Sequence, residues 1–320
     1  MKTLSNQKHN LFSMKNCATW IIGLLLLSTT TVNAQQEPTY TQYMFNTQTV
    51  NPAYAGTWES MGFMFLAREQ WTGFENAPST QTFTFQTLHK NRKVGLGLNV
   101  VNDKFGLEKR LSVFGDYSYL VKMDEELKLR LGLKIGFSNY SNNLSSYDLI
   151  DETDPRFQGE NEQQFMPNFG VGAFMYKDKY YLGLSVPKII NNEFKNNYNN
   201  YSAQAELRHF YLMGGYVFNL SDNLQFKPTF LSKVTAGAPP QLDVTANFLI
   251  AERFWIGSMV RTGDSFGFIA QWIINKNLRF GYAVDFTTSK LHHYEDGTHE
   301  IMVSYELKSL KEVFTSPRYF

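Results

Sequence analysis

The sequence lacks the features that mark a nucleic-acid-binding protein or a hydrolytic enzyme of a common type. Its 320 residues carry 30 Lys and Arg against 29 Asp and Glu, so no basic surplus is available for binding nucleic acid. It contains no H-E-x-x-H motif and no glycine-rich phosphate loop. We therefore expect a protein that is not an enzyme, with no catalytic residue, no cofactor and no metal ion.

Cysteine is almost absent, because Cys17 is the only one in the chain. It lies in an N-terminal segment with three lysines and no acid, then an apolar core, then small residues ahead of a cleavage point: Lys2, Lys8, Lys15, Ala18 to Leu27, Val32 and Ala34. The apolar core is too short to cross a bilayer, which takes about 20 residues. Residues 1–34 are therefore predicted to be a cleaved signal peptide, and an uncleaved anchor is the less favoured alternative. The mature chain then has neither a disulfide nor a thiol nucleophile.

No later segment has the long apolar run of a transmembrane helix, but apolar and polar residues alternate from Met61 to Lys308. One stretch shows the pattern clearly, with Leu127, Leu129, Leu131, Leu133, Ile135 and Phe137 between Lys128, Arg130, Gly132, Lys134, Gly136 and Ser138. Successive residues of a strand point to opposite faces, so this pattern gives a sheet with one apolar and one polar face. A soluble β-sandwich would show the same alternation. Strands of about 10 residues and aromatic residues at their ends favour a membrane barrel.

The fold class predicted here is therefore all-β, a transmembrane antiparallel outer-membrane β-barrel of about 14 strands. The expected strands start near Met61, Thr80, Lys93, Arg110, Glu126, Pro167, Lys179, Arg208, Asn223, Pro240, Glu252, Ser265, Asn277 and His299. With this count the even-numbered connections are short, and the odd-numbered ones include the three longest, at 139–166, 187–207 and 288–298. Short periplasmic turns and long outer loops are typical of bacterial outer-membrane barrels.

Two segments of the mature chain lie outside the predicted barrel of residues 61–308. Residues 35–60 carry six large apolar or aromatic side chains, at Tyr40, Tyr43, Met44, Phe45, Tyr54 and Trp58. That is too much apolar surface for a solvated tail, so we expect a periplasmic or lumen-plugging segment. Residues 309–320 are expected to form a periplasmic C-terminal tail. Pro317 excludes a strand that reaches Phe320, because proline cannot donate a hydrogen bond to a ladder.

Four strings give the chain a family resemblance. PTYTQYMFNTQTVNPAYAG starts at Pro38, REQWTGFENAP at Arg68, HEIMVSYEL at His299 and the terminal SPRYF at Ser316. Together they resemble the PorP/SprF family of outer-membrane proteins of the type IX secretion system, and the ending resembles its SprF branch. The resemblance covers essentially the whole mature chain.

This resemblance implies a role in secretion and gliding motility that the strand pattern cannot supply. Such barrels assist secretion, or surface anchoring, of adhesins whose C-terminal domains are not cleaved, and they act by binding. The implied partners are the secreted adhesin or its C-terminal domain, a periplasmic peptidoglycan-binding or motor-associated envelope protein, and outer-membrane lipid, but no nucleic acid. The residues that match the motifs are the partner-binding candidates: Tyr43, Asn46, Asn51, Pro52, Tyr54, Gly56, Arg68, Trp71, Pro317, Arg318, Tyr319 and Phe320.

Two of these motifs also have simpler interpretations. Asn51 to Gly56 has the composition of a turn, so it is either a turn at the barrel entrance or a docking or plug element. Arg68 is expected to pair with a carboxylate inside the barrel, such as Asp116 or Glu306, rather than with a partner's carboxylate.

Two clusters that could hold a metal ion are better explained as solvated loops. His292 and His293, with His299 and Glu300, do not match the ligand spacing of a zinc motif. Residues 151–162 are acidic, but Pro155 interrupts the alternation of oxygen ligands that a calcium loop requires.

Two other functions remain open at this point. A barrel of this size conducts if it is unplugged, so a diffusion porin is the main alternative, with Lys128, Arg130 and Lys134 setting its ion selectivity. An outer-membrane hydrolase would need a catalytic dyad or triad at the lipid face or the outer rim.

Overall fold

The computed structural model describes residues 37–123, 126–142, 162–195 and 202–307. By its internal contacts the chain divides into two units. The smaller contains residues 1–34 and 237–239, and the larger, residues 35–236 and 240–320, contains every strand. Among the described residues, no helix has the length and the apolar character needed to cross a membrane.

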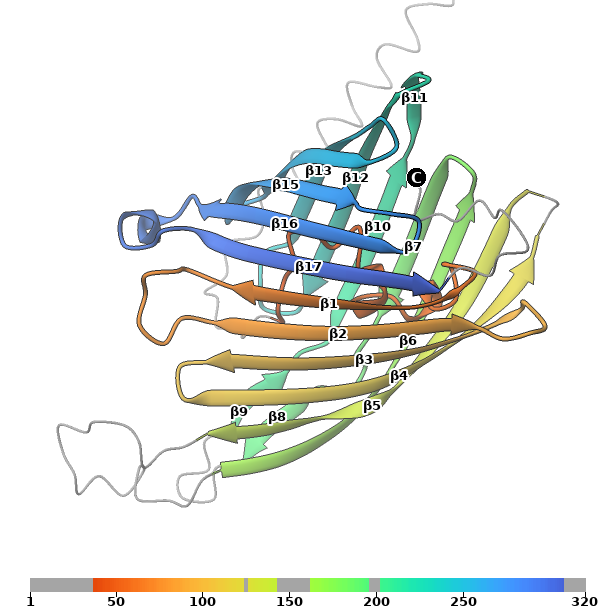
Figure 1. The fold of residues 1–320 in the computed structure, drawn as a ribbon. Coiled ribbons are helices and arrows are strands. Elements are labelled where there is room, and N and C mark those ends of the chain that lie inside the picture. The colour runs from red at the N-terminus through yellow and green to blue at the C-terminus, as the bar shows by residue number, and fades with distance from the viewer. Residues whose placement is uncertain (1–36, 124–125, 143–161, 196–201, 308–320) are drawn as a thin grey trace, which may run out of the picture. The chain divides into compact units, whose positions relative to one another are not determined.

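The larger unit is an antiparallel sheet in which most strands pair with their sequence neighbours (Figure 1). Its strands are β1 Met61–Glu69, β2 Ser79–Leu88, β3 Val94–Phe105, β4 Glu108–Lys122, β5 Lys128–Asn142, β6 Glu162–Lys177, β7 Tyr180–Val186, β10 His209–Tyr216, β11 Phe218–Ser221, β12 Leu224–Thr235, β13 Gln241–Ile250, β14 Phe254–Arg261, β15 Ser265–Ile273, β16 Leu278–Thr287 and β17 Thr298–Leu307. A separate hairpin is formed by β8 Asn192–Lys195 and β9 Ser202–Glu206.

The sheet closes into a ring. The first strand, β1, pairs with the last, β17, so that Met61 lies opposite Leu307 and Arg68 opposite Glu300. On the far side β10 pairs with both β7 and β12, and β11 continues β10 along β12 after an interruption at Val217. When β10 and β11 are counted as one strand, the fifteen strands of the sheet become a closed barrel of fourteen. The predicted fold class is confirmed.

Most predicted strand starts fall within two residues of the observed ones. The exception is β6, which begins at Glu162 rather than at Pro167, because its ladder with β5 continues up to the pair Asn142 and Glu162. The hairpin β8–β9 lies in a connection that was predicted to be a plain loop. The predicted acidic loop lies largely outside the described residues.

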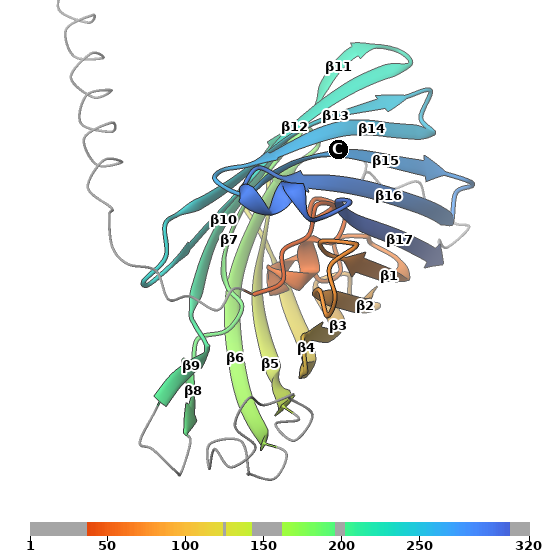
Figure 2. The ribbon, with the colours of Figure 1, turned by 90° about the vertical axis from the view of Figure 1, so that its left-hand side faces the viewer.

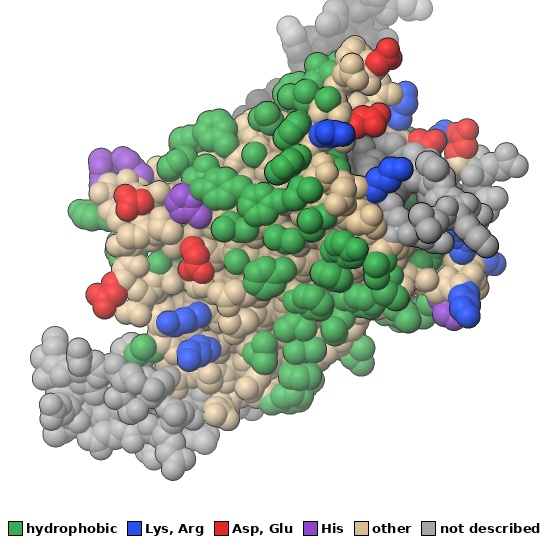
Figure 3. Space-filling model, in the orientation of Figure 1, with side chains coloured by type: hydrophobic (Ala, Val, Ile, Leu, Met, Phe, Trp, Pro, Cys, Tyr) green, Lys and Arg blue, Asp and Glu red, His purple; other side chains and the backbone are tan. Residues whose placement is uncertain are grey.

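The two faces of the barrel wall differ as the alternation predicts. On β5, Leu133 and Ile135 are 59% and 74% exposed, whereas Arg130 and Lys134 are buried on the inner side. Figure 3 shows apolar side chains spread over the outer face of the strands. An exposed apolar surface of this extent is far larger than a soluble monomer carries, and it suits contact with lipid.

The two ends of the barrel also differ. At one end the strands join through short turns, such as those between β2 and β3 and between β6 and β7. The other end carries the long connections, including residues 70–78, 187–208 and 288–297. We call this second end the outer end, because long loops face outward in bacterial barrels. The first end is called the periplasmic end.

Candidate functional site

The N-terminal segment of residues 37–60, which we call the plug, lies inside the ring of strands (Figures 1 and 2). Its aromatic side chains are almost wholly buried, with Tyr43 and Phe45 each 2% exposed and Trp58 3% exposed. They belong to one hydrophobic cluster with wall residues of several strands, among them Met64, Phe174, Met213, Trp255 and Met302. Burying this apolar surface is the main force that holds the plug in the lumen.

Ring contacts extend from one wall of the lumen to the other. The ring of Phe45 lies 6.1 Å from that of Trp255 on β14, edge to face. The ring of Tyr54 lies 5.3 Å from Phe174 on β6, which in turn stacks on Tyr181 of β7 at 5.5 Å. The plug therefore bridges opposite walls and occupies the path that a solute would take.

The Asn51–Gly56 turn is bonded directly to the barrel wall. Asn51 accepts a hydrogen bond from the backbone of Ala53 at 3.0 Å and begins the 3-10 helix η2, Pro52–Tyr54. Its side-chain amide donates to the carbonyl of Ala173 on β6 at 3.1 Å and to that of Leu184 on β7 at 3.4 Å. The turn is thus bonded to two wall strands as well as to itself.

Glycines of the wall form the surface on which this turn rests. A Cβ at Gly132 on β5 would lie 2.2 Å from the backbone nitrogen of Ala53, and one at Gly95 on β3 would lie 2.2 Å from the carbonyl of Ala55. Gly56 itself has a φ of +78°, which favours glycine. Glycine in a strand allows another backbone to approach closely, and here it makes room for the plug.

Substitution of one of these glycines tests the packing. Gly132→Ala is expected to destabilise the barrel by about 1–3 kcal/mol, because the added methyl group overlaps the plug backbone. The matched control is Gly115→Ala on β4, where the atom nearest to the added methyl group would be 3.9 Å away. Urea unfolding in lipid vesicles measures both, and equal stability of the two variants would contradict the close approach.

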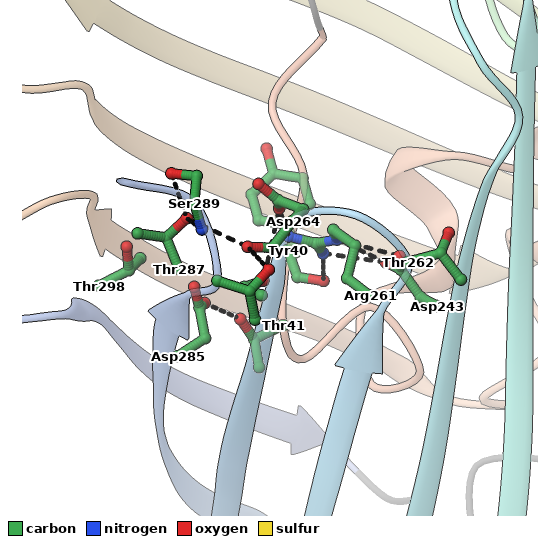
Figure 4. Close-up of polar contacts among 12 residues, drawn as sticks. Tyr40, Thr41, Asp243, Arg261, Thr262, Asp264, Asp285, Thr287, Ser289 and Thr298 are labelled. Carbon is green, nitrogen blue, oxygen red and sulfur yellow. Dashed lines mark hydrogen bonds and ion pairs between the residues drawn. The ribbon is translucent and has the colours of Figure 1, made fainter. Parts of the chain in front are cut away.

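The outer end of the plug is held by buried charges, which we call the outer clamp: Arg68, Asp243, Arg261, Asp285 and Glu300. Figure 4 shows part of it, with Tyr40 and Thr41 of the plug between Arg261 and Asp285. The carboxylate of Glu300 accepts the backbone N–H groups of Thr41 and Gln42 at 3.0 and 2.9 Å. Arg261 grips Asp243 through Nε and Nη2 and also donates to the carbonyl of Tyr40 at 3.4 Å.

Arg68 has carboxylate partners of the expected kind but not the two that were named. Its Nη1 lies 2.9 Å from Asp285 and 3.3 Å from Glu300, and all three side chains are buried. The suggested Asp116 instead pairs with Lys134, which lies opposite it on β5, at 3.1 Å. Glu306, at the periplasmic end, pairs with Arg279 at 3.7 Å. Cross-strand register, which the sequence does not show, decides these pairs.

A second group of charges ties the start of the plug to the outer connections. Lys188 lies 2.9 Å from Glu37 and 2.7 Å from Glu206 of β9. Burial raises the pKa of Glu37, but the attraction of Lys188 and Arg110 outweighs it and lowers that pKa to about 2. Burial also lowers the pKa of Lys188, yet the two carboxylates raise it on balance. These groups are therefore all charged at neutral pH.

The plug consequently runs the full length of the barrel. Glu37 lies among outer-end residues, whereas at the other end Ser60 donates to Glu306 at 2.6 Å and Glu59 pairs with Lys128 at 3.0 Å. The described chain thus begins at the outer end, descends through the lumen and enters β1 at the periplasmic end.

The predicted partner-binding residues fall into three groups. Six line the interior as part of the plug, and all are buried: Tyr43, Asn46, Asn51, Pro52, Tyr54 and Gly56. Arg68 is buried in the outer clamp, and Trp71 lies half-buried in the outer turn between β1 and β2, where its backbone N–H donates to the hydroxyl of Thr298 at 3.2 Å. Pro317, Arg318, Tyr319 and Phe320 lie outside the described residues, as does the tail 309–320. The structure thus joins the first motif to the wall glycines, which the sequence pattern had not singled out.

A model of the family described as "Type IX secretion system membrane protein PorP/SprF" matches residues 32–305. The chain belongs to this family. The match spans the plug and nearly the whole barrel. The family and the barrel fold together show that this PorP/SprF protein is an outer-membrane protein. The match does not separate the SprF branch from the rest of the family.

Solved structures resemble this PorP/SprF barrel only distantly, and no curated protein matches it. The outer membrane protein Omp33 of Acinetobacter baumannii aligns with a TM-score of 0.45 and 8% identity, over 78% of this chain and 99% of its own. The CymD monoaromatic hydrocarbon channel aligns with a TM-score of 0.49 and 11% identity, over 84% of this chain and 94% of its own.

Proposed function

We propose that this PorP/SprF barrel assists the secretion or surface anchoring of adhesins with non-cleaved C-terminal domains, and that it acts by binding, without a reaction. Its family supports a part in type IX secretion. The observation that supports the binding role is the plug. Its side chains contact Trp255 on one side of the lumen and Phe174 on the other, so the lumen is filled. Cargo would therefore bind at the outer face of the barrel and not pass through a pore. We further propose that residues 1–34 are removed on export.

In this proposal the two ends of the barrel have different partners. The secreted adhesin or its C-terminal domain binds at the outer end, where the turn that carries Trp71 lies. A peptidoglycan-binding or motor-associated envelope protein binds on the periplasmic side, where we place the tail with Pro317 to Phe320. The buried motif residues, Asn51 among them, hold the plug that connects the two ends.

Deletion of the gene tests the role in the cell. We expect the adhesin to disappear from the cell surface while its total amount stays unchanged, and complementation to restore it. Normal surface display in the deletion strain would refute the proposal. Crosslinking in cells, followed by identification of captured proteins, would then name the partners at each end.

Two exposed aromatic side chains make the outer contact testable. Phe74 follows Trp71 in the β1–β2 turn and is 49% exposed, and Tyr294, in the β16–β17 connection, is 71% exposed. The two connections are joined, because the backbone N–H of Thr72 donates to the carbonyl of Gly297 at 2.9 Å. Exposed aromatic residues of this kind are common anchors of protein interfaces.

The double variant Phe74→Ser with Tyr294→Ser is therefore expected to lower adhesin retention on cells about ten-fold or more, as loss of interface anchors does. Surface adhesin is measured by antibody labelling of whole cells. The control is Phe268→Ser on β15, which removes a similar ring that faces lipid rather than cargo. If only the control loses adhesin, the outer turns are not the contact.

A further inference from the structure

The outer end of the lumen holds one buried lysine without a partner. Lys233, near the end of β12, is 7% exposed, and its ammonium nitrogen makes no hydrogen bond or ion pair within the described part of the chain. A buried charge is costly unless a counter-charge or several hydrogen bonds compensate it. Such a group calls for an anion that completes the site.

The nearby carboxylates are already engaged. Asp243 borders the same space as Lys233, but Arg261 holds both of its oxygens at 2.9 to 3.1 Å. Glu37 is held by Lys188, as described above. Each of these carboxylates thus has a closer cation, and Lys233 has no direct hydrogen-bond partner among the described residues.

A small cavity lies beside this lysine. Its volume is about 20 Å³, room for about one water molecule or one end of a carboxylate. Lys233 lines it together with Pro38, Tyr40, Tyr211 and Leu231, and Asp243 and Gln241 also border it, so the lysine shares this space with aromatic rings and one carboxylate.

A second cavity adjoins the first. It has a volume of about 70 Å³ and shares Pro38, Tyr40, Val50 and Tyr211 with it. Charged side chains of both signs line it as well, among them Asp103, Arg110 and Lys188. His209 also lines it, is 3% exposed, and has an Nε2 without a hydrogen-bond partner among the described residues. Lys233 and His209, each with a buried nitrogen that lacks a hydrogen-bond partner among the described residues, thus line two adjoining cavities next to the start of the plug.

We propose that Lys233 and these two cavities form a binding site for a carboxylate group at the outer end of the barrel. One carboxylate oxygen accepts from the ammonium of Lys233, and the carbon chain behind it lies against the rings of Tyr40 and Tyr211 in the larger cavity. A carboxylate oxygen accepts a charge-assisted hydrogen bond from an ammonium group, and the space beside Lys233 has room for one such oxygen. The carboxylate comes either from a small free acid or from the C-terminus of a peptide, and the site's chemistry is the same for both.

Binding to the purified full barrel in detergent tests the site. The probes are acetate, the peptide acetyl-Ala-Ala-Ala with a free terminal carboxylate, and the same peptide as its amide. Calorimetric titration is expected to show binding of the peptide acid, of acetate or of both, and none of the amide. Binding of the peptide acid alone assigns the site to a peptide terminus, and acetate binding at equal strength assigns it to small acids. Absence of binding by both carboxylates would overturn the proposal.

Two substitutions distinguish carboxylate binding at Lys233 from a general attraction of carboxylates to the positive charges of the barrel. Lys233→Met is expected to weaken carboxylate binding about ten-fold or more, since it removes a charge-assisted hydrogen bond. Lys104→Met removes an exposed positive charge at the same end of the barrel and should leave binding unchanged. Equal binding by the Lys233→Met variant and the parent would overturn the assignment.

A measurement on the unsubstituted protein tests the same site without depending on whether the Lys233→Met variant folds. The melting temperature is expected to rise with acetate concentration and not with chloride at the same ionic strength, because a ligand that binds only the folded state stabilises it. An identical response to both anions would also overturn the proposal.

Discussion

Planar lipid bilayers that contain the purified barrel are expected to show no steady conductance. The ring contacts from Phe45 to Trp255 and from Tyr54 to Phe174 cross the lumen, and the plug backbone lies directly on the glycines of β3 and β5. A variant that lacks residues 37–57 should instead open in discrete steps, since an empty barrel of fourteen strands encloses a water-filled lumen. The diffusion porin is the alternative that this experiment addresses.

The comparison needs proof that both proteins are folded. Heat-modifiable migration on gels supplies it, because a closed barrel migrates differently before and after boiling. If the plugless variant does not fold, the double variant Phe45→Ala with Tyr54→Ala removes two rings that bridge the lumen and should raise conductance in the same direction. Steady, ion-selective conductance by the unsubstituted barrel would establish a porin and remove the main support for the binding role.

Arg68→Met is expected to be the most destabilising single substitution in the outer clamp, by about 3–5 kcal/mol. It leaves the carboxylates of Asp285 and Glu300 close together and buried, without the cation that lies 2.9 and 3.3 Å from them. Urea unfolding in vesicles measures the loss. Lys290→Met, which removes an exposed charge in the outer 3-10 helix η4, Lys290–His293, should have almost no effect.

A second substitution distinguishes lost pairing from lost packing. Adding Glu300→Gln to the Arg68→Met variant removes one of the uncompensated charges, and the single side-chain oxygen of the glutamine keeps one of the two hydrogen bonds that the carboxylate accepts from the backbone of Thr41 and Gln42. The double variant should therefore be more stable than Arg68→Met alone. If it is less stable, the arginine acts mainly through its packing, and the electrostatic account of the clamp fails.

The barrel was predictable from the sequence because its wall is simple. Each strand, such as β5, has one face toward lipid and one toward the lumen. The alternation along residues 127–138 therefore predicts which side chains lie on each face and approximately where the strand ends. The hairpin β8–β9 was missed because it belongs to neither face of that wall, and its strands of 4 and 5 residues are too short for a pattern to indicate them. The early start of β6 was missed for a related reason, since its outer part pairs beyond the region where the alternation is regular.

The interior could be predicted only in part. The composition of residues 35–60 showed that they needed burial, and Asn51 to Gly56 had the composition of a turn, but the surface beneath the turn is made of glycines that look like ordinary small residues of a polar face. Their common position on the inner side of β3 and β5, at Gly95 and Gly132, was the available signal. Ion pairs such as Arg68 with Asp285 depend on which strands meet in space, and no local pattern contains that information.

The course of the plug has a consequence for biogenesis. Residues 37–60 precede β1, and β1 and β17 form the seam at which the first strand meets the last. The rings of Tyr54 and Trp58 pack against side chains of the wall, and they can do so while the sheet is still open. We therefore expect residues 37–60 to lie against the curling sheet before the seam is sealed, so that this protein folds its wall around the segment that precedes β1.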